Sequence, residues 1–182
     1  MEEWLIWVNE LDQEIGYGEK MKTHREERLH RAFSIFLYDP QTRKLLLHQR
    51  AAGKYHSGGL WTNACCSHPR RGEEIRDAAV RRLKEELGIT LDTNAALQEL
   101  GSFQYYQKYT NCAEHEIDHV FFLSVNAQRL SLYPDPEEIA QLRWVTFSEL
   151  KHWMSECPQD FTAWFAKVLE LVLREKKGIE IL

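Results

Sequence analysis

Two kinds of segment are missing from this sequence: a long apolar run and an N-terminal leader. No stretch approaches the ~18 consecutive apolar residues that a membrane-spanning helix requires. The N-terminus has no basic region followed by an apolar one. Both absences lead us to expect a cytoplasmic protein that has no membrane partner.

Cysteine is also scarce. The chain contains four cysteines, Cys65, Cys66, Cys112 and Cys157, and they lack the spacing of a zinc ribbon. Cys65 and Cys66 are adjacent and would be strained in a disulfide with each other. We therefore expect reduced thiols rather than a disulfide framework.

The chain also has no net positive charge. The formal net charge is -5, which argues against a broad face that binds nucleic acid. Basic residues nevertheless cluster locally, which suits either a pocket for an anionic ligand or a solvated surface. They are Arg25, Arg28, Arg31, Lys54, Arg70, Arg71, Arg81 and Arg82.

The chain also has no internal repeat and no low-complexity tract. Hydrophobic residues make up 43% and charged residues 28%, a composition typical of globular proteins. A chain of 182 residues can bury a complete core. We expect one domain over residues 1–182.

Apolar and β-branched runs between turn residues predict the strands. They cover residues 4–8, 32–38, 44–49, 60–66, 97–109, 116–125 and 142–147. The loop over residues 51–59 carries Lys54 and His56 and contains the glycine pair Gly58 and Gly59.

Three helices are predicted from periodicity and capping residues. Apolar residues recur every four positions up to Leu87, and Gly88 follows, which predicts a helix over residues 74–87. A second helix is expected from about Ser148. Asp160 is a good N-cap for a terminal helix over about 160–176. This order of elements predicts an α+β fold, with a mixed sheet packed between helices.

Histidines and glutamates from distant segments form the first candidate site. His24 and His30 lie six residues apart and His68 is far from both. Only the fold could assemble them, and for each alone a surface or hydrogen-bonded imidazole is the commoner role. Glu114 and Glu116 are two apart in a strand and project from one face. Such carboxylates repel unless a cation separates them or solvent surrounds them. Mixed imidazole and carboxylate ligands suit zinc, manganese or iron, and magnesium is also possible.

Cys66 and His68 form the second candidate site. They share one face of a predicted strand, whereas Cys65 points to the other face. A cysteine near a histidine and several arginines can have its proton affinity tuned. Inert packing is the commoner role of a buried cysteine. Trp164 is likewise either a core residue or a ring that faces a cation.

Several of these residues resemble a known family. One set of residues resembles the Nudix box: Glu73, Arg81, Leu83, Glu85, Glu86, Gly88 and Ile89. Residues 61–69, with the sequence WTNACCSHP, resemble the corresponding segment of the type 1 isopentenyl-diphosphate isomerases of the Nudix superfamily. The resemblance extends from about Lys20 to Trp164 and implies a Nudix-like fold.

Two positions depart from the hydrolase form of the box. Ser67 stands where the box opens with glycine, and Arg82 stands where a glutamate should follow Arg81. A cation in place of a metal-binding carboxylate disfavours pyrophosphate hydrolysis assisted by several metals. It favours the binding of an intact diphosphate.

The resemblance implies roles for individual residues. The implied ligands of a divalent metal (Mn, Zn or Mg) are His24, His30, His68, Glu114 and Glu116, and Glu86 would help to hold Mg on the substrate diphosphate. The implied diphosphate-binding residues are Lys20, Arg50, Lys54 and Arg82, and the apolar tail would lie against Trp61 and Trp164. The implied catalytic residues are Cys66 and Glu116 as acid and base, Tyr105 as an assistant of Glu116, and Trp164 as the ring facing the carbocation.

The implied reaction interconverts isopentenyl diphosphate and dimethylallyl diphosphate, a step of isoprenoid precursor biosynthesis, in a monomer or homodimer without nucleic acid. Protonation of the terminal methylene gives a tertiary carbocation, and a neighbouring carbon then loses a proton. Two alternatives use the same fold. Arg82 argues against a Nudix pyrophosphohydrolase, and a non-catalytic regulator would not need an acid and a base.

Overall fold

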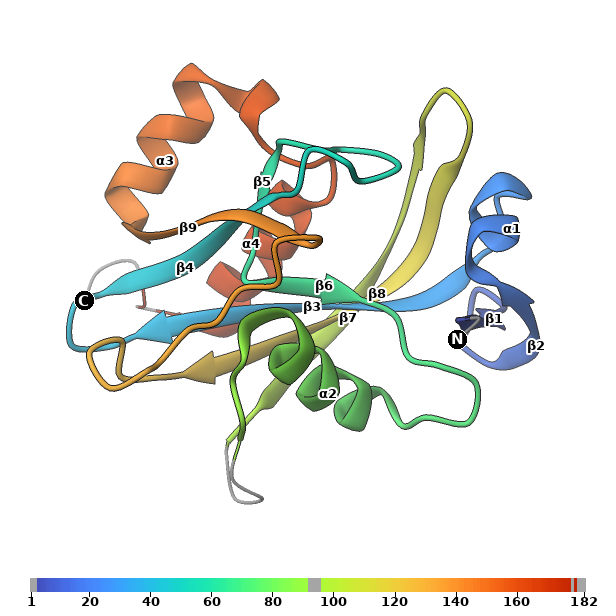
Figure 1. Ribbon diagram of the computed structural model, residues 1–182, viewed down its shortest axis with the longest axis horizontal. Coiled ribbons are helices and arrows are strands. Elements are labelled where there is room, and N and C mark those ends of the chain that lie inside the picture. The colour runs from blue at the N-terminus through green and yellow to red at the C-terminus, as the bar shows by residue number, and fades with distance from the viewer. Residues whose placement is uncertain (1–2, 92–95, 178, 180–182) are drawn as a thin grey trace.

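The computed structural model describes residues 3–91, 96–177 and 179. Of the domain expected over residues 1–182, positions 1–2, 92–95, 178 and 180–182 lie outside the described residues. Within the described residues, nine strands form one mixed sheet, and helices cover both of its faces (Figure 1). This architecture confirms the expected α+β fold.

Strand β3 is the centre of the sheet. The strands are β1 (Trp4–Val8), β2 (Glu14–Glu19), β3 (His30–Asp39), β4 (Lys44–Arg50), β5 (Trp61–Thr62), β6 (Cys65–Ser67), β7 (Gln98–Lys108), β8 (Ala113–Ser124) and β9 (Ile139–Thr146). β3 pairs antiparallel with β1, β4 and β6, and parallel with β8. β2 pairs with β1, β5 and β9 pair with β4, and β7 pairs with β8. The β3–β8 pair therefore joins the β7–β8 hairpin to the rest of the sheet.

Four α-helices and one 3-10 helix accompany the sheet in the described part of the chain. They are α1 (Lys20–Arg25), α2 (Ile75–Leu87), α3 (Phe147–Glu156), η1 (Pro158–Asp160) and α4 (Phe165–Glu175). α2 ends where predicted, because Gly88 adopts a left-handed conformation with φ of 70° and its N–H donates to the Lys84 carbonyl. No helix among the described residues is long and apolar enough to cross a membrane.

Alternation along β3 divides the core into two layers. Phe36 and Tyr38 pack in a cluster with residues of α4, whereas Ile35 and Leu37 pack with residues of α2. Successive side chains of a strand point to opposite faces, so α2 and α4 cover opposite faces of the sheet (Figure 1). The sequence alternation of β3 thus fixes which helix each residue meets.

The single strand predicted over residues 60–66 is wrong. Two short strands, β5 and β6, stand there instead, separated by Asn63 and Ala64. The Asn63 side-chain amide donates to the carbonyls of Ile35, at 3.2 Å, and Cys65, at 2.8 Å. A side chain here makes hydrogen bonds that backbone groups would make in a continuous strand, so the chain turns between the two pieces.

The start predicted for the terminal helix is also wrong. Asp160 ends η1, and its carboxylate accepts a hydrogen bond from Nε1 of Trp153 at 2.8 Å rather than capping a helix. α4 begins at Phe165. The strands predicted from residues 116 and 142 both begin earlier, at Ala113 and Ile139.

Candidate active site and metal centre

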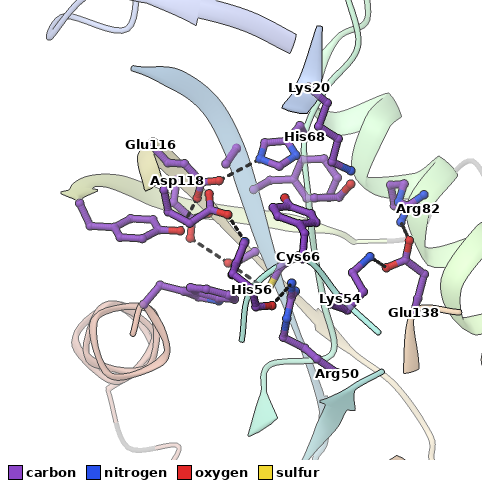
Figure 2. A pocket seen from close by; sticks show the side chains of 18 residues that line it. Lys20, Arg50, Lys54, His56, Cys66, His68, Arg82, Glu116, Asp118 and Glu138 are labelled. Carbon is purple, nitrogen blue, oxygen red and sulfur yellow. Dashed lines mark hydrogen bonds and ion pairs between the residues drawn. The ribbon is translucent and has the colours of Figure 1, made fainter. Parts of the chain in front are cut away.

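One pocket lies over the N-terminal half of β8 and the neighbouring part of β3 (Figure 2). Glu114, Glu116 and Asp118 alternate along β8 and therefore project from one face into it. The parallel register sets His30 opposite Glu116 and Ala32 opposite Asp118. The surrounding wall comes from α1, the loop of residues 51–59, β6, α2 and the residue before α4.

Five potential metal ligands converge at one side of this pocket. They are His24, His30, His68, Glu114 and Glu116, and one ligand atom from each lies within 4.8 Å of all the others. Nε2 of His30 lies 3.4 Å from Oε1 of Glu116 and 3.3 Å from Nε2 of His68. The structure thus brings together residues that are up to 92 positions apart in the chain, from His24 to Glu116.

Backbone carbonyls orient two of the imidazoles. Nδ1 of His24 lies 2.7 Å from the Lys20 carbonyl, one turn earlier in α1, and Nδ1 of His30 lies 2.7 Å from the Arg28 carbonyl. A carbonyl only accepts, so Nδ1 carries a proton in each ring and Nε2 faces the cluster. A ring oriented in this way can bind a metal through Nε2.

The remaining members of the cluster also fit a divalent cation. Burial lowers the pKa of His68 to about 4 against the opposing influence of Glu116, so this imidazole is neutral. Oε2 of Glu114 is buried and has no hydrogen-bond partner among the described residues. Imidazoles and an unsatisfied carboxylate oxygen that face one point are a donor set suited to a cation.

Cys66 lines the same pocket from β6, whereas Cys65 is buried in the layer under α2. All four cysteines are free, as expected from the sequence. Burial, followed by the nearby Asp118 carboxyl, raises the pKa of Cys66 to about 12. Its thiol donates to Oδ1 of Asn63 at 3.1 Å. Cys66 is therefore a protonated thiol that is able to donate a proton.

Glu116 carries a hydrogen bond on each oxygen. Oε2 accepts from the Tyr105 hydroxyl at 2.5 Å, and Oε1 lies 2.8 Å from Nε2 of His68. Burial, with the negative charge of Glu116, raises the pKa of Tyr105 well above its usual range. Tyr105 thus remains a hydrogen-bond donor that holds the carboxylate in the pocket.

Four cationic side chains also line the pocket: Lys20, Arg50, Lys54 and Arg82. Figure 2 shows Lys54 and Arg82 converging on Glu138, with Lys54 Nζ 2.6 Å and Arg82 Nη2 3.2 Å from its carboxylate oxygens. Arg50 lies over the Trp164 ring, 5.5 Å from its centroid. Trp164 is 4% exposed and also lines the pocket, so an aromatic face lies beside the cationic group.

Comparisons with known proteins agree with this geometry. The sequence profile of the NUDIX domain matches residues 28–165. An isopentenyl-diphosphate Delta-isomerase of Photobacterium profundum is 44% identical over 178 residues, which cover 96% of this chain and 97% of the relative. A protein of the same name from Burkholderia multivorans is 44% identical over 171 residues, covering 93% of each chain. The chain belongs to the isopentenyl-diphosphate Delta-isomerase family.

Solved structures are similar in fold. The DR0079 protein of Deinococcus radiodurans has a TM-score of 0.72 at 23% identity and covers 96% of this chain and 100% of its own. A MutT protein of Methanosarcina mazei Go1 has a TM-score of 0.62 at 18% identity, with coverage of 82% and 96%. These similarities confirm the Nudix fold, on which this isomerase-family chain is built.

Four residues that the resemblance to the isomerase family implied are not among the described residues that line the pocket: His24 and His30, which belong to the neighbouring ligand cluster, and Glu86 and Trp61. Glu86 is 2% exposed and lies behind Arg82, whose Nη2 is 2.6 Å from Glu86 Oε1. Burial raises the pKa of Glu86 against the opposing charge of Arg82. Trp61 packs edge-on against Trp153, with 5.3 Å between the ring centroids.

Several residues that line the isomerase-family pocket were not predicted as site residues, among them His56, Asp118 and Glu138. Asp118 continues the spacing of two that linked Glu114 to Glu116, so the same alternation could have identified it. Burial and the nearby charge of Glu116 raise the pKa of Asp118 well above its usual range. His56 and Glu138 lie in loops whose paths no periodicity defines.

Proposed function

We propose that this protein is an isomerase that interconverts isopentenyl diphosphate and dimethylallyl diphosphate. One observation carries the proposal: a protonated thiol, Cys66, and a carboxylate held by a tyrosine, Glu116, line the same pocket as four cations. Moving a double bond by proton addition and removal needs an acid and a base on one bound substrate. A diphosphate needs several cations to hold it.

Proton transfer is the work of Cys66 and Glu116. One of the two adds a proton to the terminal methylene, and the positive charge then rests on the tertiary carbon. The other removes a proton from the neighbouring carbon, so the double bond forms one position further along and the substrate keeps its net charge. In the reverse direction the two groups exchange roles, as microscopic reversibility requires.

Trp164 and Tyr105 support this chemistry. The negative face of an indole stabilises a cation within about 6 Å of its centroid, and Arg50 already occupies such a position over Trp164. Tyr105 holds the Glu116 carboxylate through its 2.5 Å hydrogen bond. Burial of both aromatic rings keeps out water that would otherwise trap the carbocation.

Substrate binding uses the charged side of the pocket. Lys20, Arg50, Lys54 and Arg82 would contact the diphosphate, and its oxygens would replace Glu138 as a partner of Lys54 and Arg82. A diphosphate that carries two to three negative charges competes well with one carboxylate for two cations. The apolar tail of the substrate would then lie against Trp164, with Trp61 at the border of the same apolar cluster.

His24, His30, His68, Glu114 and Glu116 would hold a divalent cation, for which we propose Mn, Zn or Mg. When bound, the cation supplies positive charge that offsets the repulsion between Glu114 and Glu116 and adjusts the proton affinity of Glu116. Glu86 would help to hold a second ion, Mg, on the substrate diphosphate. We also infer that the protein acts in the cytoplasm, in isoprenoid precursor biosynthesis.

Incubation with isopentenyl diphosphate and magnesium in deuterated water, followed by NMR with and without a chelator, tests this proposal. We expect dimethylallyl diphosphate that carries deuterium, formed only in the absence of the chelator. Release of phosphate without a new alkene would identify a hydrolase instead. An unchanged substrate would identify a regulator that has kept the fold without the reaction.

A further inference from the structure

His56 lies at the junction of the cationic loop and the cluster of metal ligands. Its side chain is 2% exposed, and its Nε2 contacts Oε1 of Glu114. Its backbone carbonyl accepts a hydrogen bond from Nη2 of Arg50 at 3.3 Å. One residue therefore touches a candidate metal ligand through its ring and a candidate diphosphate-binding residue through its backbone.

Aromatic neighbours hold the His56 ring on three sides. It stacks on Tyr109, with 4.6 Å between centroids and 18° between the planes. Tyr55 and Trp164 meet it edge-on, with centroids at 4.5 Å and 5.9 Å. Nδ1 lies 3.1 Å from the Ser57 hydroxyl. These contacts fix the ring orientation, so Nε2 stays directed at Glu114.

The loop that presents His56 is also fixed. The Gly59 N–H donates to the Arg50 carbonyl at 3.0 Å and closes the base of the loop. A Cβ atom at Gly58 would come within 2.6 Å of the Ala52 carbonyl oxygen, so only glycine fits there. The position of His56 is therefore set by the loop itself and does not depend on its contact with Glu114.

Glu114 shows what this contact accomplishes. Its Oε1 faces His56, whereas its Oε2 lies 3.4 Å from Nε2 of His24, inside the ligand cluster. One oxygen lies against the His56 ring, and the other faces the ligand cluster without a hydrogen-bond partner among the described residues.

We infer that His56 is a positioning residue for the metal centre, whose Nε2–H donates to Oε1 of Glu114 and directs Oε2 to the divalent cation. The inference rests on the proposed function only in that both require a cation at this cluster. Through Arg50, His56 also joins the cation site to the loop that carries Lys54. Ligand orientation by a neighbouring hydrogen bond is a general means of raising metal affinity.

Mn²⁺ alone, without substrate, is the probe for this role. We would measure its Kd by competition with a chelator for wild-type protein, His56→Phe and His56→Gln. The phenyl ring keeps the stacking on Tyr109 and removes the N–H, whereas the glutamine amide keeps an N–H near the position of Nε2. His152→Ala, on the exposed side of α3, is the matched control.

The two substitutions should separate the hydrogen bond from the packing. We expect His56→Phe to bind Mn²⁺ about 10- to 100-fold more weakly, as is typical when a partner of a metal ligand is lost. His56→Gln should recover most of this affinity, and His152→Ala should match wild type. Wild-type affinity in His56→Phe, or equal weakness in His56→Gln, would overturn the inference.

A double-mutant cycle identifies the atom through which His56 acts. In a Glu114→Gln background, His56→Phe should cause little further loss of Mn²⁺ affinity, because the carboxylate that it orients is gone. A full additional loss would mean that His56 acts elsewhere. If His56→Phe does not fold, as judged by circular dichroism, His56→Leu gives the comparison instead, because leucine keeps an apolar contact with Tyr109 and removes the N–H.

The measurement of Mn²⁺ affinity tests the role of His56 separately from the isomerase reaction. A wild-type protein that binds Mn²⁺ but does not isomerise isopentenyl diphosphate would refute the proposed function and leave the role of His56 intact. An active isomerase whose Mn²⁺ affinity is insensitive to His56→Phe would do the opposite.

Discussion

The sheet face that α4 covers has two halves of opposite character. Along β3 and β8, Phe36 and Phe122 pack in the cluster beneath α4, whereas Glu116 and Asp118, on the same face of β8 as Phe122, line the pocket. The alternation is continuous, so side-chain direction is the same in both halves. What differs is the cover: an amphipathic helix over one half, and a short helix and a loop over the other.

The comparison separates residues that stabilise the fold from residues that serve chemistry. Burying one large apolar side chain contributes about 1.5–3 kcal/mol, and the half beneath α4 is made of such residues. Burying carboxylates without full compensation costs free energy, and the pocket half holds three of them, Glu114, Glu116 and Asp118. Substitutions in the two halves should therefore affect different properties.

Cys66→Ala should have the largest effect, and on activity alone. Loss of one member of an acid–base pair lowers kcat by about 10²- to 10⁴-fold, whereas removal of one partly buried sulfur atom changes stability little. Steady-state kinetics and thermal unfolding of the same preparation would measure both. Cys65→Ala is the matched control, because Cys65 faces α2 and should leave kcat unchanged. Full activity in Cys66→Ala would contradict the proposed roles.

Phe122→Ala should have the reverse effect in the apolar half. Phe122 is 3% exposed, and truncation of a buried phenylalanine lowers the free energy of unfolding by about 3–5 kcal/mol. Urea denaturation would measure this loss. The kcat of the remaining folded protein should equal that of wild type, and a parallel loss of kcat would show that the two halves are coupled.

His48 is a buried histidine outside the pocket, and its effect on the pH dependence of stability can be compared with that of the cluster histidines. Burial, with the nearby charge of Arg50, lowers the pKa of His48 from 6.5 to about 4. The unfolded chain therefore takes up a proton before the folded one does. The contribution of His48 to stability should be full above pH 6.5 and be lost as the pH falls toward about 4, a loss of about 3 kcal/mol.

Urea denaturation across this pH range, with and without Mn²⁺, would isolate the His48 contribution. His48→Gln should flatten the pH dependence equally under both conditions, because His48 does not belong to the ligand cluster. A flattening that appears only without Mn²⁺ would assign the effect to the cluster histidines instead.

Thr146→Ala should have the smallest effect on stability. Thr146 lies at the start of α3, outside both halves of the sheet face. Thr146 caps α3, where its hydroxyl accepts from the Glu149 N–H at 3.2 Å and the Glu149 carboxylate accepts from the Thr146 N–H at 2.7 Å. Loss of such a cap costs about 1 kcal/mol. Thermal unfolding should show a small decrease in Tm with unchanged kinetics, and a loss of activity would connect α3 to the pocket.

Local periodicity predicted the parts of the site that lie within one strand. The spacing of two placed Glu114 beside Glu116, and the adjacency of Cys65 and Cys66 placed one thiol in the pocket and the other under α2. The helix ending at Gly88 was predictable for the same reason, because both its apolar period and its C-terminal glycine are local.

Contacts between distant segments were beyond the reach of such patterns. His56 reaches Glu114 because the closed loop before β5 aims it there, and no spacing in the sequence encodes that direction. Asp160 is a residue type favoured at N-caps, yet its carboxylate accepts a hydrogen bond from the Trp153 indole instead. Tertiary partners decide the role of a polar residue where several roles suit its chemistry.

The pKa of about 12 at Cys66 bears on how the protein withstands oxidation. The thiolate is the form of cysteine that reacts with peroxides and alkylating reagents. At neutral pH the fraction of such a thiol that is present as the thiolate is on the order of 10⁻⁵. The property that keeps a proton on the sulfur therefore also protects the sulfur, and an irreversible inhibitor that targets thiols should react slowly with Cys66.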